Sequence, residues 1–228
     1  MNLTKLDIKG LGKAKYILKE GGTLGDLYTT SNLRFNDNGY VEVDKNGNLL
    51  MTDEGEDIYL GSVFPNHNLA WRNDFSYKGI NLGVLFTARL GGVCYSATQA
   101  NLDLYGVSEA SAAARDAGGV LINGREMVDA QKWYQAIGSQ SGLPQYYLYS
   151  ATNVRLQELS LGYTFPRKWF RNKLGLTVSF VGRNLWMIYC KAPFDPEAVA
   201  STGLNYQGID YFMMPSMRNL GFNVKFQF

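Results

Sequence analysis

The chain has 228 residues, enough for one or two soluble domains or for part of a large barrel. Its 22 basic and 20 acidic residues nearly cancel, so charge does not favour a nucleic-acid partner. No run of about 18 apolar residues occurs, which excludes a membrane-spanning helix.

Residues 1–67 are rich in turn signals. The sequences Asn-Asp-Asn-Gly at 36–39 and Asn-Gly at 46–47 are typical of hairpin turns, and each is flanked by short alternating segments. The first residues lack the 7–15-residue apolar core of a signal peptide. An exported barrel needs such a leader, so we expect either that export is lost or that this chain is the C-terminal part of a longer protein.

A regular alternation of apolar and polar residues begins after residue 67. Apolar residues occupy every second position from Leu69 to Tyr77, with only Asn73 breaking the pattern, and again from Ile80 to Leu90. Because successive strand side chains point to opposite faces, both segments predict amphipathic strands. Lys78-Gly79 between them predicts a tight hairpin turn, and each strand is about long enough to cross a bilayer when tilted.

A long insertion follows, over about residues 93–152. Residues 108–115 predict a short helix capped by Ser108, and residues 129–136 predict a second one. The insertion also carries aromatic residues, among them Trp133 and Tyr134. They are candidates for stacking on a sugar, although packing of the insertion against itself is the favoured interpretation.

Three further strands are predicted in the C-terminal third. Residues 153–165 alternate with a change of parity that predicts a bulge near Gln157-Glu158. After a short basic connection at 166–173, a fourth strand runs from Leu174 to about Arg183. A long loop over about 189–218 then leads to the last ten residues, which alternate without a break and end on Phe228.

The connections alternate between short and long, as they do in outer-membrane barrels. We therefore predict an all-β fold, an antiparallel transmembrane β-barrel segment with long extracellular loops at about 93–152 and 189–218. Apolar faces would contact membrane lipid and polar faces the lumen. Arg89 and Arg183 fall on the lumen face, where they would line a solute path or, as is favoured, simply fill a wet interior.

Several segments also resemble the SusC/RagA-type TonB-linked outer-membrane transporters. They follow the order of that family and cover nearly the whole chain: 25–28 (GDLY), 60–66 (LGSVFPN), 114–119 (ARDAGG), 154–166 (VRLQELSLGYTFP), 182–186 (GRNLW), 194–197 (FDPE) and 215–218 (PSMR).

The resemblance implies a barrel of roughly 22 strands with a plugged lumen. Such transporters take up oligosaccharides or peptides across the outer membrane of Bacteroidetes-type cells, with energy from TonB and a SusD-like lipoprotein as partner. Residues 1–228 would be the C-terminal part of the barrel. The segments that resemble the family do not include its plug or its TonB-contacting segment, so we expect the chain alone to be inactive in transport.

Two other functions fit the sequence less well. A soluble β-rich carbohydrate-binding module would leave large apolar strand faces in water unless a second sheet covered them. An enzyme is not expected, because the chain has one His and no nucleophile elbow, P-loop or dinucleotide motif. No cofactor or metal site is expected either, since His67, Cys94 and Cys190 lack ligand spacing. Two free thiols are favoured over a disulfide.

Overall fold

The computed structural model describes the chain except residues 1–4, 10–11, 53–54, 139–140 and 199–206. The chain folds into two compact units, each assembled from three segments. The first, which we call the sheet unit, comprises Pro65–Gly91, Ala151–Glu197 and Met214–Phe228. The second, the insert unit, comprises Met1–Phe64, Gly92–Ser150 and Ala198–Met213.

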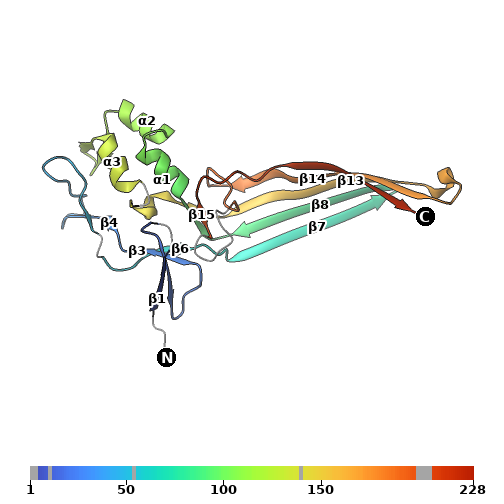
Figure 1. Cartoon of the computed structure of the whole chain (residues 1–228), viewed down its shortest axis with the longest axis horizontal. Helices are drawn as coiled ribbons and strands as arrows, with labels where there is room; N and C mark the ends of the chain where they lie inside the picture. Colours follow the sequence, from blue (N-terminus) through green and yellow to red (C-terminus); the bar gives the residue numbers. More distant parts are fainter. Residues whose placement is uncertain (1–4, 10–11, 53–54, 139–140, 199–206) are drawn as a thin grey trace. The chain divides into compact units, whose positions relative to one another are not determined.

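The sheet unit is built on one five-stranded antiparallel sheet with the order β16-β14-β13-β8-β7 (Figure 1). Its strands are β7 (His67–Tyr77), β8 (Ile80–Leu90), β13 (Asn153–Phe165), β14 (Gly175–Cys190) and β16 (Asn219–Gln227). The predicted antiparallel strands are thus confirmed. The sheet is open, with β7 and β16 as its edges in the part of the chain that the structure describes.

The register brings like residues into rows that cross all five strands. One row is entirely apolar and consists of Phe75, Leu82, Leu161, Phe180 and Phe222. The neighbouring row points to the other face and consists of Ser76, Asn81, Gly162, Ser179 and Asn223. The sheet therefore has one apolar and one polar face, and the side chain of Phe222 is 80% exposed.

Two predicted irregularities of the sheet are confirmed. Lys78 and Gly79 both have positive φ, 47° and 91°, which is the backbone of a type I′ hairpin turn. The register of β13 shifts between Leu156 and Glu158 against both neighbours. This bulge keeps Leu156 and Leu159 on the apolar face although their spacing is odd.

Strand β14 is longer than predicted, since it continues to Cys190 instead of ending near Arg183. Asn184 adopts a left-handed conformation with φ 53° inside the strand. This local kink interrupts the alternation in the sequence, so the second half of the strand was not recognised. The short connection between β13 and β14 contains the 3₁₀ turn η2 (Arg167–Phe170).

The insert unit contains only short strands, none longer than five residues in the described part of the chain. A four-stranded antiparallel sheet has the order β1-β2-β3-β6 and comprises β1 (Lys5–Lys9), β2 (Lys15–Lys19), β3 (Asp26–Thr29) and β6 (Ile58–Ser62). The small ladders are β4 (Asn32–Leu33) with β5 (Met51–Thr52), β10 (Val120–Ile122) with β11 (Glu126–Val128), and β12 (Leu148–Ser150), β9 (Val93–Ser96) and β15 (Ile209–Asp210). Strands of this length are too short to cross a bilayer.

Three helices complete the insert unit: α1 (Ala97–Leu104), α2 (Glu109–Asp116) and α3 (Ala130–Ile137). The hydroxyl of Ser108 accepts a hydrogen bond from Ser111 N, so the predicted cap is confirmed, and both predicted helices are present. The carboxylate of Asp129 caps the second helix by accepting a hydrogen bond from Lys132 N. Helix α1, capped by Ser96, was not predicted. No helix among the described residues is long and apolar enough to cross a membrane.

The insert unit has its own hydrophobic core, so the chain is not purely all-β. Buried residues of the core include Tyr95, Ala100, Leu143 and Ile209, with the 3₁₀ turn η1 (Pro144–Tyr147) packed among them. Cys94, in this unit, and Cys190, in the sheet unit, are both thiols and not halves of a disulfide, as the sequence favoured.

Candidate functional site

A buried arginine organises the polar side of the sheet unit. Arg155 lies on β13, and its side chain is only 3% exposed. The bulge that follows it places Arg155 and Glu158 on the same polar face of the sheet, because it shifts the parity of the strand by one residue. A guanidinium cannot lose its charge at neutral pH, so its burial requires a compensating partner.

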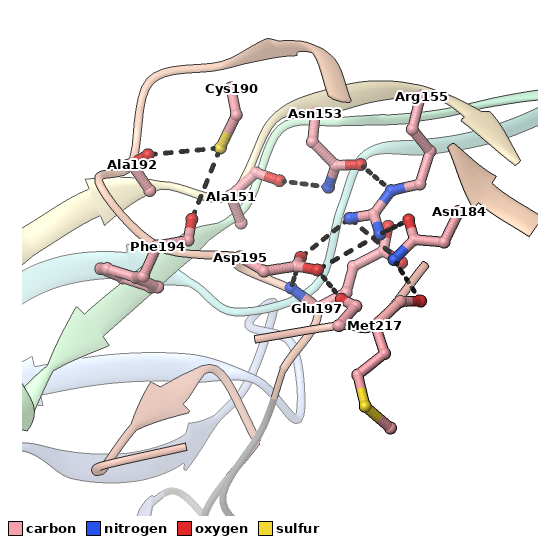
Figure 2. Close-up of polar contacts among 11 residues, drawn as sticks. Ala151, Asn153, Arg155, Asn184, Cys190, Ala192, Phe194, Asp195, Glu197 and Met217 are labelled. Atoms are coloured by element: carbon pink, nitrogen blue, oxygen red, sulfur yellow. Dashed lines mark hydrogen bonds and ion pairs between the residues drawn. The ribbon is translucent and has the colours of Figure 1, made fainter. Parts of the chain in front are cut away.

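That partner is Asp195, on the connection that follows β14. Arg155 Nη2 lies 2.9 Å from Asp195 Oδ1, and Nη1 lies 3.4 Å from Oδ2 (Figure 2). The Oε2 atom of Glu197 lies 3.5 Å from the same Nη2. A two-point pairing of planar groups of this kind is directional as well as strong.

Two asparagines complete the coordination of the guanidinium. Arg155 Nε donates to Asn153 Oδ1 at 3.2 Å, and Nη1 donates to Asn184 Oδ1 at 3.4 Å. The left-handed backbone of Asn184 belongs to the kink in β14 described above. The bulge in β13 follows Arg155 closely in the sequence, and the kink in β14 supplies a hydrogen-bond partner to the same arginine.

The network also reaches the segment that leads into β16. The hydroxyl of Ser216 donates to Asp195 Oδ2, and Asn184 Nδ2 donates to the carbonyl oxygen of Met217 at 3.4 Å. At the other end of the connection, the Cys190 thiol contacts the carbonyl oxygens of Ala192 and Phe194 at 3.5 and 3.7 Å (Figure 2). The start and the end of the long connection are thus tied to one point of the sheet.

Four of the motifs noted in the sequence meet in this network: 154–166, 182–186, 194–197 and 215–218. All of the groups around Arg155 are supplied by the protein itself. The arrangement holds the base of a long connection in place. The network therefore has a structural role, which is to attach the connection to the sheet.

A second charged group lies further along the polar face, and we call it the polar-face cluster: Arg72, Asp74, Glu158 and Arg183. Arg72 Nε donates to Asp74 Oδ2 at 2.8 Å, and Arg183 Nε donates to Glu158 Oε2 at 2.9 Å. Arg72 Nη1 lies 3.6 Å from Glu158 Oε1 and links the two pairs. Gly83 leaves room for the cluster, because a Cβ there would lie 2.8 Å from Asp74 Oδ1.

The residues singled out from the sequence lie in both units. Arg183 is 65% exposed on the polar face, and Arg89 is half-buried on the same face, opposite Asn153 in the register. Trp133 packs against the core of the insert unit and meets Tyr146 edge-on at 6.0 Å, whereas Tyr134 lines a cavity among the helices. A contact of any of these four with a solute stays a prediction.

Sequence reasoning missed Arg155 and its partners as a site. Asp195 and Glu197 lie in an Asp-Pro-Glu sequence that is typical of a turn, and Arg155 was part of a motif without an assigned role. The one local signal is that Arg155 is a charged residue in a strand with neighbours on both sides.

Comparisons with known proteins find similarity both in sequence and in fold. No protein-family model matches the chain. A TonB-dependent receptor named P3 from Formosa agariphila is 26% identical over 198 residues, which is 82% of this chain and 19% of the receptor.

Solved structures of a RagAB peptide importer are similar in fold. The "open-open" state matches with a TM-score of 0.51 at 17% identity over 97% of this chain and 27% of that chain. The "closed-closed" state matches with a TM-score of 0.49 at 19% identity, over 97% of this chain and 28% of that chain.

The resemblance to TonB-linked receptors expected from the motifs is therefore confirmed. The chain spans about a fifth of the length of the curated relative and about a quarter of the solved importer chain. These relatives are a receptor and an importer, which agrees with the expectation that the chain is not an enzyme.

Proposed function

We propose that the sheet unit forms part of the wall of an outer-membrane β-barrel in a TonB-dependent transporter for nutrients. The observation that carries the proposal is the division of the sheet into an apolar and a polar face across all five strands. Large apolar side chains exposed on one face would be unfavourable in water and suit lipid, while the polar face suits a wet lumen.

The connections support the same orientation. Two of them are short, Lys78-Gly79 and the one that contains η2, and both lie at one end of the antiparallel sheet. The long connections lie at the opposite end, where Arg155 and Asp195 hold one of them. In outer-membrane barrels the short turns are periplasmic and the long loops extracellular. The insert unit would accordingly lie outside the cell.

The solute would be an oligosaccharide or a peptide, and a peptide is favoured because the solved relatives are described as peptide importers. A SusD-like lipoprotein would assemble with the extracellular side, and TonB would contact another part of the complete transporter. Since the chain covers only part of such relatives, it would not transport by itself.

Fractionation of cells that express the chain from its own genomic locus tests the proposal. An antibody against the insert unit should detect the protein in the outer-membrane fraction, in a form that runs differently on gels before and after heating. Recovery of a soluble, folded protein without detergent would overturn the proposal and favour a carbohydrate-binding module instead.

A further inference from the structure

A small cavity lies among the three helices of the insert unit. It measures about 200 Å³ and is lined by Asp103, Gly106, Ser111, Arg115, Ala130 and Tyr134. Pockets that hold a whole small ligand usually measure roughly 300–1,000 Å³. The cavity is therefore suited to one end group of a larger solute.

The carboxylate of Asp103 is the negatively charged group that lines this cavity. The residue is 5% exposed, and Oδ1 accepts a hydrogen bond from Gln99 Nε2 at 2.8 Å. The ion pairs among the described residues do not include Asp103. A carboxylate withdrawn from water without a cation is costly, so the site favours a positive charge.

Arg115 is the cation that lines this cavity. Its Nη1 donates to the carbonyl oxygen of Gly106 at 2.7 Å, and the ion pairs among the described residues do not join it to Asp103. Helix α1 ends beside Asp103 and has no basic residue in its last turn, so the partial negative charge of the helix end adds to that of the carboxylate.

Three tyrosines interact electrostatically with the same carboxylate. Burial and, next, the negative charge of Asp103 raise the pKa of Tyr134, Tyr147 and Tyr149. Tyr134 lies on the wall of the cavity, where the electron-rich face of a tyrosine ring attracts cations.

We infer that this cavity binds a protonated primary amine, such as the N-terminus of a peptide or a lysine side chain. The inference rests on the proposed function, because it names the class of solute that the insert unit selects. Asp103 pairs with the ammonium group, Gln99 keeps the carboxylate oriented, and Tyr134 covers the alkyl part of the solute. Neutral oligosaccharides lack the charge that the site requires.

Calorimetry on the purified full chain in detergent tests the inference. The probes are trialanine and N-acetyl-trialanine at neutral pH, in which an acetyl group replaces the charge of the terminal ammonium. We expect trialanine to bind at least 10-fold more tightly. This comparison uses the unaltered chain, so it does not depend on whether a variant folds. Equal affinities, or no binding of trialanine, would overturn the inference.

A pair of variants localises the effect. Asp103→Asn should abolish the preference for the free amine, whereas Asp116→Asn, an exposed residue at the end of α2, should retain it. A preference that persists in Asp103→Asn would place the amine elsewhere and overturn the assignment. If the protein is in the outer membrane but does not bind the amine, the inference fails and the proposed function stands. If the protein is soluble and binds the amine, the proposed function fails and the amine site stands.

Discussion

The guanidinium of Arg155 pairs with both carboxylate oxygens of Asp195, 40 residues further along the chain. Arg155 belongs to a strand of the sheet, and Asp195 belongs to the long connection between β14 and β16. The pair fixes that connection relative to the wall of the sheet.

Replacement of Arg155 by Met should destabilise the sheet unit by about 3–5 kcal/mol, because it leaves the carboxylate of Asp195 buried without its cation. Arg183→Met is the matched control. Arg183 lies on the adjacent strand and pairs with Glu158, but it is 65% exposed, so its loss should cost less than about 1 kcal/mol. Denaturant titration of the folded protein, identified by its different migration on gels before and after heating, measures the loss of unfolding free energy in both variants. Equal losses would contradict the anchoring role of Arg155.

Substitution on the apolar face should be much more costly than substitution on the polar face. Phe222→Arg near the middle of β16 should cost about 2–4 kcal/mol in lipid if the residue faces the bilayer midplane. Asn223→Arg, one position further on, points to the polar face and should cost little. The fraction of each variant that folds into lipid vesicles gives the comparison, and a reversed order would show that the two faces are assigned wrongly.

The hairpin turn between β7 and β8 should require glycine at position 79. Its φ is 91°, and a Cβ there would lie 2.7 Å from the carbonyl oxygen of Thr164. We expect Gly79→Ala to destabilise the sheet unit by roughly 1–3 kcal/mol. Gly221→Ala is the control, since a Cβ at that position meets no atom within 4 Å. It should be neutral or slightly stabilising in unfolding measurements, and similar losses in the two variants would contradict the assigned turn geometry.

Alkaline pH should weaken the insert unit through its buried tyrosines. Burial raises the pKa of Tyr95 to about 12, above the usual value of 10. Between these two pH values the folded state therefore keeps a proton that the unfolded state releases. The contribution of Tyr95 to the free energy of unfolding is fully present below about pH 10 and is lost as pH rises towards 12. The loss per group is about 1 kcal/mol per pH unit.

Tyr95→Phe should reduce the number of protons released on unfolding at alkaline pH by about one, and the dependence of the unfolding free energy on pH becomes correspondingly less steep. The fluorescence of Trp133, the single tryptophan of the insert unit, reports the transition when the other three tryptophans are replaced by Phe. An unchanged slope in the variant would contradict a raised pKa at Tyr95.

The strands of the sheet unit were predictable because each has one apolar and one polar face, so residue type repeats with a period of two. The bulge at Gln157 was predictable for the same reason, as a visible change of parity. The second half of β14 was not, since the left-handed Asn184 breaks the pattern inside a continuous strand.

The insert unit was harder to predict because its strands are short and its helices have only two turns. Helix α1 was missed although Ser96 and Gln99 have the spacing of a capping pair. The pairing of Arg155 with Asp195 depends on the path of a connection between them, and no local pattern encodes it. Asp103 likewise gains its role only when three helices enclose it.

The central claim, that the apolar face of the sheet contacts lipid, is best tested by spin labels placed in turn at residues 219–227 of the chain in its own membrane. Cys94 and Cys190 would first be replaced by Ser. Collision with oxygen, which concentrates in lipid, should be high at Leu220, Phe222, Val224 and Phe226. Collision with a water-soluble nickel chelate should be high at the residues between them. Uniform or reversed accessibility along β16 would contradict the assignment of this sheet to a membrane barrel.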